Sequence, residues 1–152
     1  MDEEELNGVM KYEYERIMEK NKEILEFGID IKIEKEDYTK WEITLTAPED
    51  SDYKGGKYKV EAKFNLEYPL VNPTFTFKTK IYHCNVDDDG KLKVNWLLKG
   101  MKIDYILPRL LTLFYLQDTS VDENSEKSKL YLNNKDEFME NVKKNVELTK
   151  NN

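Results

Sequence analysis

The sequence predicts an α+β fold in which helices pack on one face of a four-stranded antiparallel sheet. Four short runs alternate apolar and polar residues and are separated by polar turns, which is typical of a meander of half-buried strands. Apolar residues recur at helical spacing both before and after these runs. With 152 residues, the chain is expected to form one domain, residues 1–152.

The first predicted element is an amino-terminal helix over residues 6–20. Met10, Tyr14, Ile17 and Met18 share one face of this helix, because their spacing matches the helical repeat. The alternation of apolar and polar residues then predicts four strands, at residues 27–33, 41–47, 58–64 and 75–77.

The periodicity disappears between residues 81 and 102, and an irregular stretch of this length inside a compact domain is usually functional. Pro108 is favourable as the first residue of a helix, so we expect a buried central helix to begin there. Its apolar residues at helical spacing are Leu110, Leu111, Phe114 and Tyr115. Two carboxyl-terminal helices are expected over residues 126–132 and 135–148.

Composition argues against several classes of function. The formal net charge is −7 and the isoelectric point is near 4.9, whereas nucleic acids and anionic membranes require a basic surface. No apolar run approaches the roughly 20 residues that cross a bilayer, and the acidic amino terminus is unlike a signal peptide. We therefore expect a cytoplasmic or nuclear protein that binds neither nucleic acid nor membrane.

The chain contains one cysteine, Cys84, and one histidine, His83. No disulfide can form within the chain, and no set of cysteines and histidines has the spacing of a zinc site. A Ser-His-Asp site or a histidine-rich metal site is disfavoured for the same reason. We therefore expect neither a metal nor another cofactor.

Short motifs accompany the predicted strands in a fixed order. They are Trp41 ahead of Ala47-Pro48, Tyr53-Lys54-Gly55-Gly56, Tyr68-Pro69, Pro73-Thr74-Phe75 and Ile81-Tyr82-His83-Cys84-Asn85. Together these motifs resemble the core of the ubiquitin-conjugating (E2) family, and the resemblance covers nearly the whole chain. It implies the E2 fold, which has the same order of elements. It also implies a role in the conjugation of ubiquitin or a ubiquitin-like protein.

Lys93 stands ten residues after His83, where the family carries its nucleophilic cysteine. A lysine with its ordinary pKa of about 10.4 is almost fully protonated at pH 7 and is a poor nucleophile. An acyl group on Lys93 would form an isopeptide amide, which cannot be passed on. Either the chain is a natural variant without the cysteine, or a cysteine was replaced by lysine. Departures from the family at other positions favour the natural variant.

The resemblance also implies roles for the residues around the irregular stretch. His83 is expected to hold the loop by bonding to nearby backbone. Asn85 matches the asparagine that stabilises an oxyanion in the family, but without a nucleophile we favour a role in bracing the loop. Cys84 replaces the family's proline, and a lone cysteine beside apolar residues is more often a buried side chain than a substitute nucleophile.

Two acidic residues and two basic residues match positions of the family. Asp122 and Glu123 lie where the family carries an acidic residue that orients the incoming lysine and helps it lose its proton. Lys11 and Arg16 match basic residues that face the activating enzyme, in a first helix that is otherwise rich in acids. In a chain this acidic, two carboxylates in a loop are also what a solvated surface would contain.

Three apolar residues correspond to the family's ligase-facing loops. Leu70 follows the Tyr-Pro motif, and Met101 and Ile103 precede the central helix. These side chains are expected either to form an apolar patch that faces an E3 ligase or to pack in the core.

Three functions remain open from the sequence. The leading interpretation is an E2-fold protein without thioester activity, which acts as a partner or scaffold for an active E2 or an E3 ligase. The alternative is an active E2 whose cysteine at position 93 was replaced by lysine. A third possibility is an interaction domain outside the pathway that reuses the scaffold.

Overall fold

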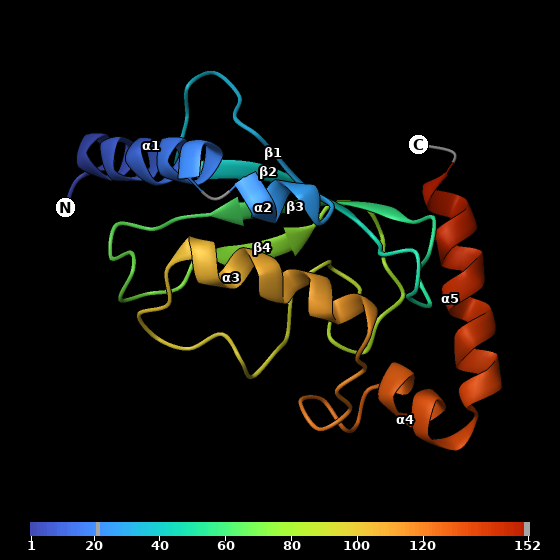
Figure 1. Cartoon of the computed structure of the whole chain (residues 1–152). Helices are drawn as coiled ribbons and strands as arrows, with labels where there is room; N and C mark the ends of the chain where they lie inside the picture. Colours follow the sequence, from blue (N-terminus) through green and yellow to red (C-terminus); the bar gives the residue numbers. More distant parts are fainter. Residues whose placement is uncertain (21, 151–152) are drawn as a thin grey trace.

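A computed structural model describes residues 1–20 and 22–150 of the chain, and it contains a four-stranded antiparallel sheet with helices around it (Figure 1). The strands pair in the order in which they occur in the chain, which confirms the predicted meander. Their bounds are Ile29–Lys32 for β1, Lys40–Thr46 for β2, Lys57–Lys63 for β3 and Thr74–Phe77 for β4.

The strand register places one row of apolar side chains across the whole sheet. Ile31, Ile43, Val60 and Phe77 are paired from β1 to β4, and all four are buried. Because side chains alternate between the two faces of a strand, the neighbouring polar residues of each strand face the other side. The apolar face of the sheet therefore forms one wall of the core.

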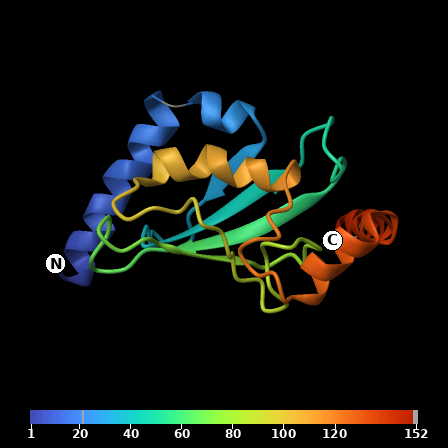
Figure 2. The same cartoon turned by 90° about the horizontal axis from the view of Figure 1, so that it is seen from below.

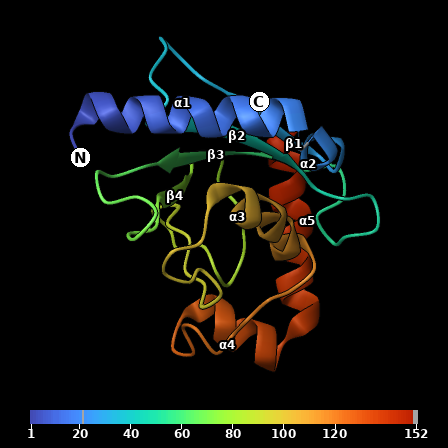
Figure 3. The same cartoon turned by 60° about the vertical axis from the view of Figure 1, so that its left-hand side comes forward.

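Helices cover this apolar face and one end of the strands. Figure 2 shows α1, α2 and α3 on the same side of the sheet, and Figure 3 shows α5 rising from α4 towards the strands. The Tyr58 hydroxyl of β3 donates to Asn145 of α5 at 2.7 Å. The helices are α1 (Glu3–Lys20), α2 (Lys22–Glu26), α3 (Ile103–Leu110), α4 (Glu126–Asn133) and α5 (Lys135–Thr149), with a 3₁₀ turn η1 (Leu111–Phe114) after α3.

The start of the central helix differs from the prediction. α3 begins at Ile103, and Pro108 lies inside it on the exposed side. Four residues of this short helix are completely buried: Ile103, Ile106, Leu107 and Leu110. Burial of this apolar face outweighs the local preference of proline for a first helical position. Proline cannot donate to the preceding turn, and the helix changes to 3₁₀ geometry soon after it.

The sequence also gave no indication of α2, whose five residues include none that is buried. Such a short helix has too few residues for a clear apolar periodicity. Across residues 1–20 and 22–150, no helix has the length and apolar character needed to span a bilayer.

Candidate functional site

The irregular stretch after β4 is folded back against that strand. Residues 86 and 92 form an isolated bridge, and Thr76 pairs with Lys91. Gly90 has a φ of 85°, and its carbonyl oxygen accepts a hydrogen bond from the Phe77 N–H at 2.6 Å. A Cβ at position 90 would lie 2.3 Å from the Phe77 carbonyl oxygen, so glycine is required for this turn to lie against β4.

The side chain of Asn85 joins three segments of the site. Its Nδ2 donates to the carbonyl of Lys93 at 3.1 Å and to the carbonyl of Asp118 at 3.0 Å. Its Oδ1 accepts the N–H of Asp118 at 3.0 Å. Both amide hydrogens are thus used inside the protein, so this arrangement leaves neither one for an oxyanion. The geometry favours the bracing role for Asn85.

His83 is completely buried and is bonded at both ring nitrogens. Nδ1 accepts the N–H of Asn85 at 2.9 Å, and Nε2 lies 2.6 Å from the carbonyl oxygen of Leu113. Because Nδ1 is an acceptor, the proton resides on Nε2 and the ring is neutral. Burial lowers the pKa of His83 to about 4. A neutral imidazole in this position ties the loop to η1.

The backbone of Cys84 shows how the fold accommodates the loss of the family's proline. Proline has no N–H, whereas the N–H of Cys84 donates to Oε1 of Gln117 at 2.8 Å. Gln117 in turn donates from Nε2 to the hydroxyl of Tyr53 at 2.7 Å, and that hydroxyl donates to the carbonyl of Tyr82. Sequence reasoning missed Gln117. The sequence did contain a signal for such a partner: a cysteine in place of proline adds a buried N–H, and a buried N–H requires an acceptor.

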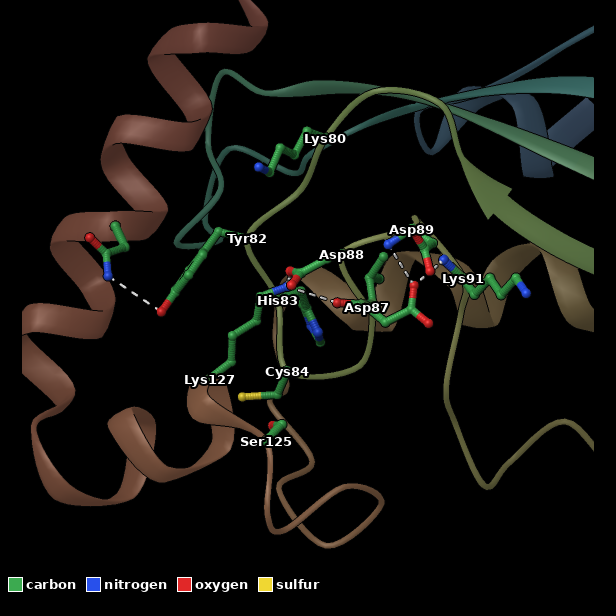
Figure 4. Close-up of polar contacts among 12 residues, drawn as sticks. Lys80, Tyr82, His83, Cys84, Asp87, Asp88, Asp89, Lys91, Ser125 and Lys127 are labelled. Atoms are coloured by element: carbon green, nitrogen blue, oxygen red, sulfur yellow. Dashed lines mark hydrogen bonds and ion pairs between the residues drawn. The ribbon is translucent and has the colours of Figure 1, made fainter.

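The thiol of Cys84 is in a poor environment for a nucleophile. The residue is buried, and its sulfur points towards the start of α4 near Ser125 (Figure 4). Burial raises the pKa of the thiol, which disfavours the reactive thiolate. A substitute catalytic role for Cys84 has no support in this geometry.

Lys93 lies at the surface, with its side chain about half exposed, and its Nζ is 3.8 Å from Oδ2 of Asp87. Desolvation raises the pKa of Asp87, but the backbone N–H donors of Lys91 and Asp89 and the charge of Lys93 outweigh it and lower the pKa. Figure 4 shows Asp87 with Lys91 and Asp89. Asp87 is therefore an anion at neutral pH. It forms an ion pair with Lys93 at the edge of the loop.

A cleft of about 550 Å³ contains several of the predicted residues. Cys84, Lys93 and Asp122 all line it, whereas the exposed Glu123 is not among its lining residues. Lys127 also lines the cleft, and the sequence gave no signal for it. Its Nζ donates to the Val86 carbonyl at 2.9 Å and lies 3.6 Å from Oδ1 of Asp88, so it ties α4 to the loop.

Of the two alternatives for Ile103, a patch that faces a ligase or packing in the core, the structure shows packing in the core. It is completely buried, and its N–H donates to the hydroxyl of Tyr68 at 2.9 Å. Met101 is half-buried, while Leu70 is 64% exposed. Leu98 is comparably exposed, and Asn72 links the two loops by donating to the carbonyl of Leu97 at 3.1 Å.

Arg16 is also engaged within the chain. Its guanidinium pairs with Glu13 on the same helix and lies 3.2 Å from Oδ2 of Asp104 on α3. It therefore joins α1 to α3. Lys11 remains exposed on α1.

We expect Asn85→Ala to lower the free energy of unfolding by about 2–3 kcal/mol, because three hydrogen bonds are lost and buried backbone groups become unpaired. Denaturant titration measures this change. Asn95→Ala, at an exposed position just after Lys93, is the matched control and should shift stability by less than about 0.5 kcal/mol. An unchanged midpoint for Asn85→Ala would contradict the bracing role.

The pKa of His83 makes stability depend on pH. Between its unfolded value of 6.5 and its folded value of about 4, the unfolded chain binds the proton more readily. The contribution of His83 to the free energy of unfolding is therefore complete above pH 6.5. It is lost as the pH falls from 6.5 to about 4, by on the order of 3 kcal/mol.

His83 is the only histidine, so one set of imidazole signals reports on it in NMR spectra. These signals should stay constant in the folded protein down to about pH 5 and should titrate near pH 6.5 in urea. Titration near pH 6.5 in the folded protein would show that the ring is solvated.

Known proteins match the chain over most of its length. The family model "Ubiquitin-conjugating enzyme" matches residues 9–146. Ubiquitin-conjugating enzyme E2 S of Dictyostelium discoideum is 31% identical over 139 residues, which are 89% of this chain and 64% of the relative. Probable ubiquitin-conjugating enzyme E2 31 of Arabidopsis thaliana is 30% identical over 102 residues, which are 64% of this chain and 66% of the relative.

A viral protein is similar as well. The ubiquitin-conjugating enzyme E2 of African swine fever virus (strain Badajoz 1971 Vero-adapted) is 29% identical over 131 residues, 78% of this chain and 59% of the relative. The matched region spans between 59% and 66% of the length of these three relatives. The matching family model, together with the meander and the loop held by His83 and Asn85, shows that the chain belongs to the ubiquitin-conjugating enzyme family.

Proposed function

We propose that this chain forms no thioester and acts as a partner or scaffold in the conjugation of ubiquitin or a ubiquitin-like protein, in the cytoplasm or nucleus. The observation that carries the proposal is Lys93 at the nucleophile position, with its Nζ 3.8 Å from Oδ2 of Asp87. A half-exposed ion pair adds little stability. The proposal therefore rests on the chemistry of the side chain, because an amine at this position has no sulfur with which to form a thioester.

The pair of Cys84 and Gln117 supports a natural variant over a single replaced residue. The N–H that cysteine adds at position 84 is bonded to Gln117 at 2.8 Å, and Gln117 continues the network to Tyr53. The departure from the family's proline is thus accommodated by the surrounding side chains. A chain altered only at position 93 has no reason to carry this second, accommodated change.

The proposed partners are an active E2 or an E3 ligase. Leu70 and Leu98 are both more than 60% exposed on loops joined through Asn72. Exposed leucines on adjoining loops are suited to docking a protein partner. The sulfur of half-buried Met101 accepts the N–H of Leu98 at 3.1 Å and so holds the loop of Leu98. The exposed Lys11 on α1 is a further proposed contact, for an activating enzyme.

The second candidate is an active ubiquitin-conjugating enzyme in which lysine replaced a cysteine at position 93. The arrangement of the cleft favours this alternative, because Lys93 and Asp122 line the same cleft beside the loop that Asn85 holds. A thiol at position 93 would lie at the surface of this cleft, with a carboxylate available to orient an incoming amine. The two candidates make different predictions for a restored cysteine.

We expect the chain to form no thioester when incubated with activating enzyme, ATP and modifier, because Lys93 carries no thiol and Cys84 is buried. Non-reducing electrophoresis should show no adduct that a thiol reductant removes, while an active E2 in a parallel reaction is charged. A reductant-sensitive adduct that disappears in Cys84→Ser would overturn the proposal and make Cys84 the nucleophile.

Lys93→Cys distinguishes the two candidate functions. If the chain is a natural variant, charging of Lys93→Cys should remain at least about a hundredfold slower than that of an active E2, comparable to the loss of an essential catalytic group. Lys91→Cys is the matched control, since it places an exposed thiol two residues away in the same loop. Efficient charging of Lys93→Cys but not of Lys91→Cys would establish the active enzyme instead.

A further inference from the structure

A groove that is separate from the cleft of Lys93 is lined by residues of α2, α3 and η1. Its volume is about 460 Å³, and seven of its eight lining residues are apolar or aromatic. Ile24 and Phe27 line one wall, from α2 and the residue just after it. Pro108, Leu111 and Tyr115 line the other, from α3, η1 and the residue that follows. We call this feature the α2 groove.

Nothing in the described chain covers the α2 groove. Phe27 is 69% exposed and Tyr115 is 54% exposed. The five residues of α2 include none that is buried, although a helix of one to two turns is marginal without packing. Exposed aromatic and aliphatic side chains around a groove mark a surface where another protein docks. A partner that buried Phe27 would also supply the packing that α2 lacks.

Four carboxylates and three basic groups lie on or next to the residues that line the α2 groove, or pair with them, which leaves a small excess of negative charge. Glu23 lines it, and Asp50 accepts a hydrogen bond from the hydroxyl of Tyr115. Two further carboxylates adjoin lining residues in the sequence: Glu26 beside Phe27 and Glu49 beside Pro48. The basic neighbours are Lys22, Arg109 and Lys54, of which Lys54 is paired with Glu49 at 3.8 Å. The whole chain has a net charge of −7.

We propose that the α2 groove binds a basic amphipathic helix of a partner protein. The walls are helical segments, and a helix fills such a groove with apolar side chains spaced at three and four residues. Basic residues beside those anchors would meet the carboxylates of the rim. This site is separate from the surfaces proposed above for partners in conjugation, because the α2 groove shares no lining residue with the cleft of Lys93. Its test is therefore independent of thioester formation.

The test is an NMR titration of the isotopically labelled full chain with a model peptide that has leucines at helical spacing and lysines elsewhere. A scrambled peptide of identical composition controls for charge attraction alone, and a peptide with glutamates in place of lysines controls for apolar contact alone. We expect saturable shifts in α2 and η1 with the first peptide. We expect at least about tenfold weaker binding of each control peptide.

Phe27→Asp separates docking from simple attraction, because it removes the apolar anchor while making the α2 groove more acidic. Binding of the basic amphipathic peptide should weaken at least about tenfold. Leu132→Asp is the matched control: Leu132 is 66% exposed on α4, and this change should alter affinity by less than about twofold. Glu23→Lys should weaken the basic peptide and strengthen the acidic one.

Several results would overturn the proposal. One is the absence of shifts in α2 and η1 with any peptide at millimolar concentration. Another is equal binding of the amphipathic and scrambled peptides, or an affinity that rises in Phe27→Asp. Concentration-dependent self-association that Phe27→Asp abolishes would identify the occupant as a second copy of this chain instead.

Discussion

The site depends on the buried amide of Asn85, because this one side chain bonds to the backbone on both sides of the irregular loop. It holds Lys93 and Asp118 at fixed positions relative to β4 and η1. His83 extends the same constraint by bonding the N–H of Asn85 and lying against the Leu113 carbonyl. Since these groups are buried, each unmade bond would cost the full desolvation of a polar atom. The loop is therefore ordered without regular secondary structure.

The chemistry of the site is decided by charge at its surface. Lys93 and Lys127 each have an aspartate within ion-pair distance, and Lys127 additionally binds a carbonyl oxygen. Partly solvated pairs of this kind contribute little to stability. They instead hold the two lysines against the loop, beside the aspartates that follow Val86. The surface of the site thus presents charged amines and carboxylates, while its one thiol, that of Cys84, is buried.

The sequence predicted the fold well where the signal is a period. The alternation in the four strands and the helical spacing in α1 and α5 come from residues that face one continuous apolar core, so each pattern was visible locally. It failed for the start of α3 and for α2. At α3, burial of Ile103 and Ile106 outweighed the preference of Pro108, and only packing against the sheet creates that burial.

The sequence by itself determined which chemical groups the site contains, namely a lysine at position 93, one histidine and one cysteine. The tertiary structure decided what those groups do, because burial and hydrogen-bond partners come from segments far apart in the chain. Gln117 bonds Cys84 across 33 positions, and Arg16 meets Asp104 across 88, so neither contact has a local signature. Likewise, only the tertiary structure places Ile103 in the core, because its exposure depends on where α3 lies against the sheet.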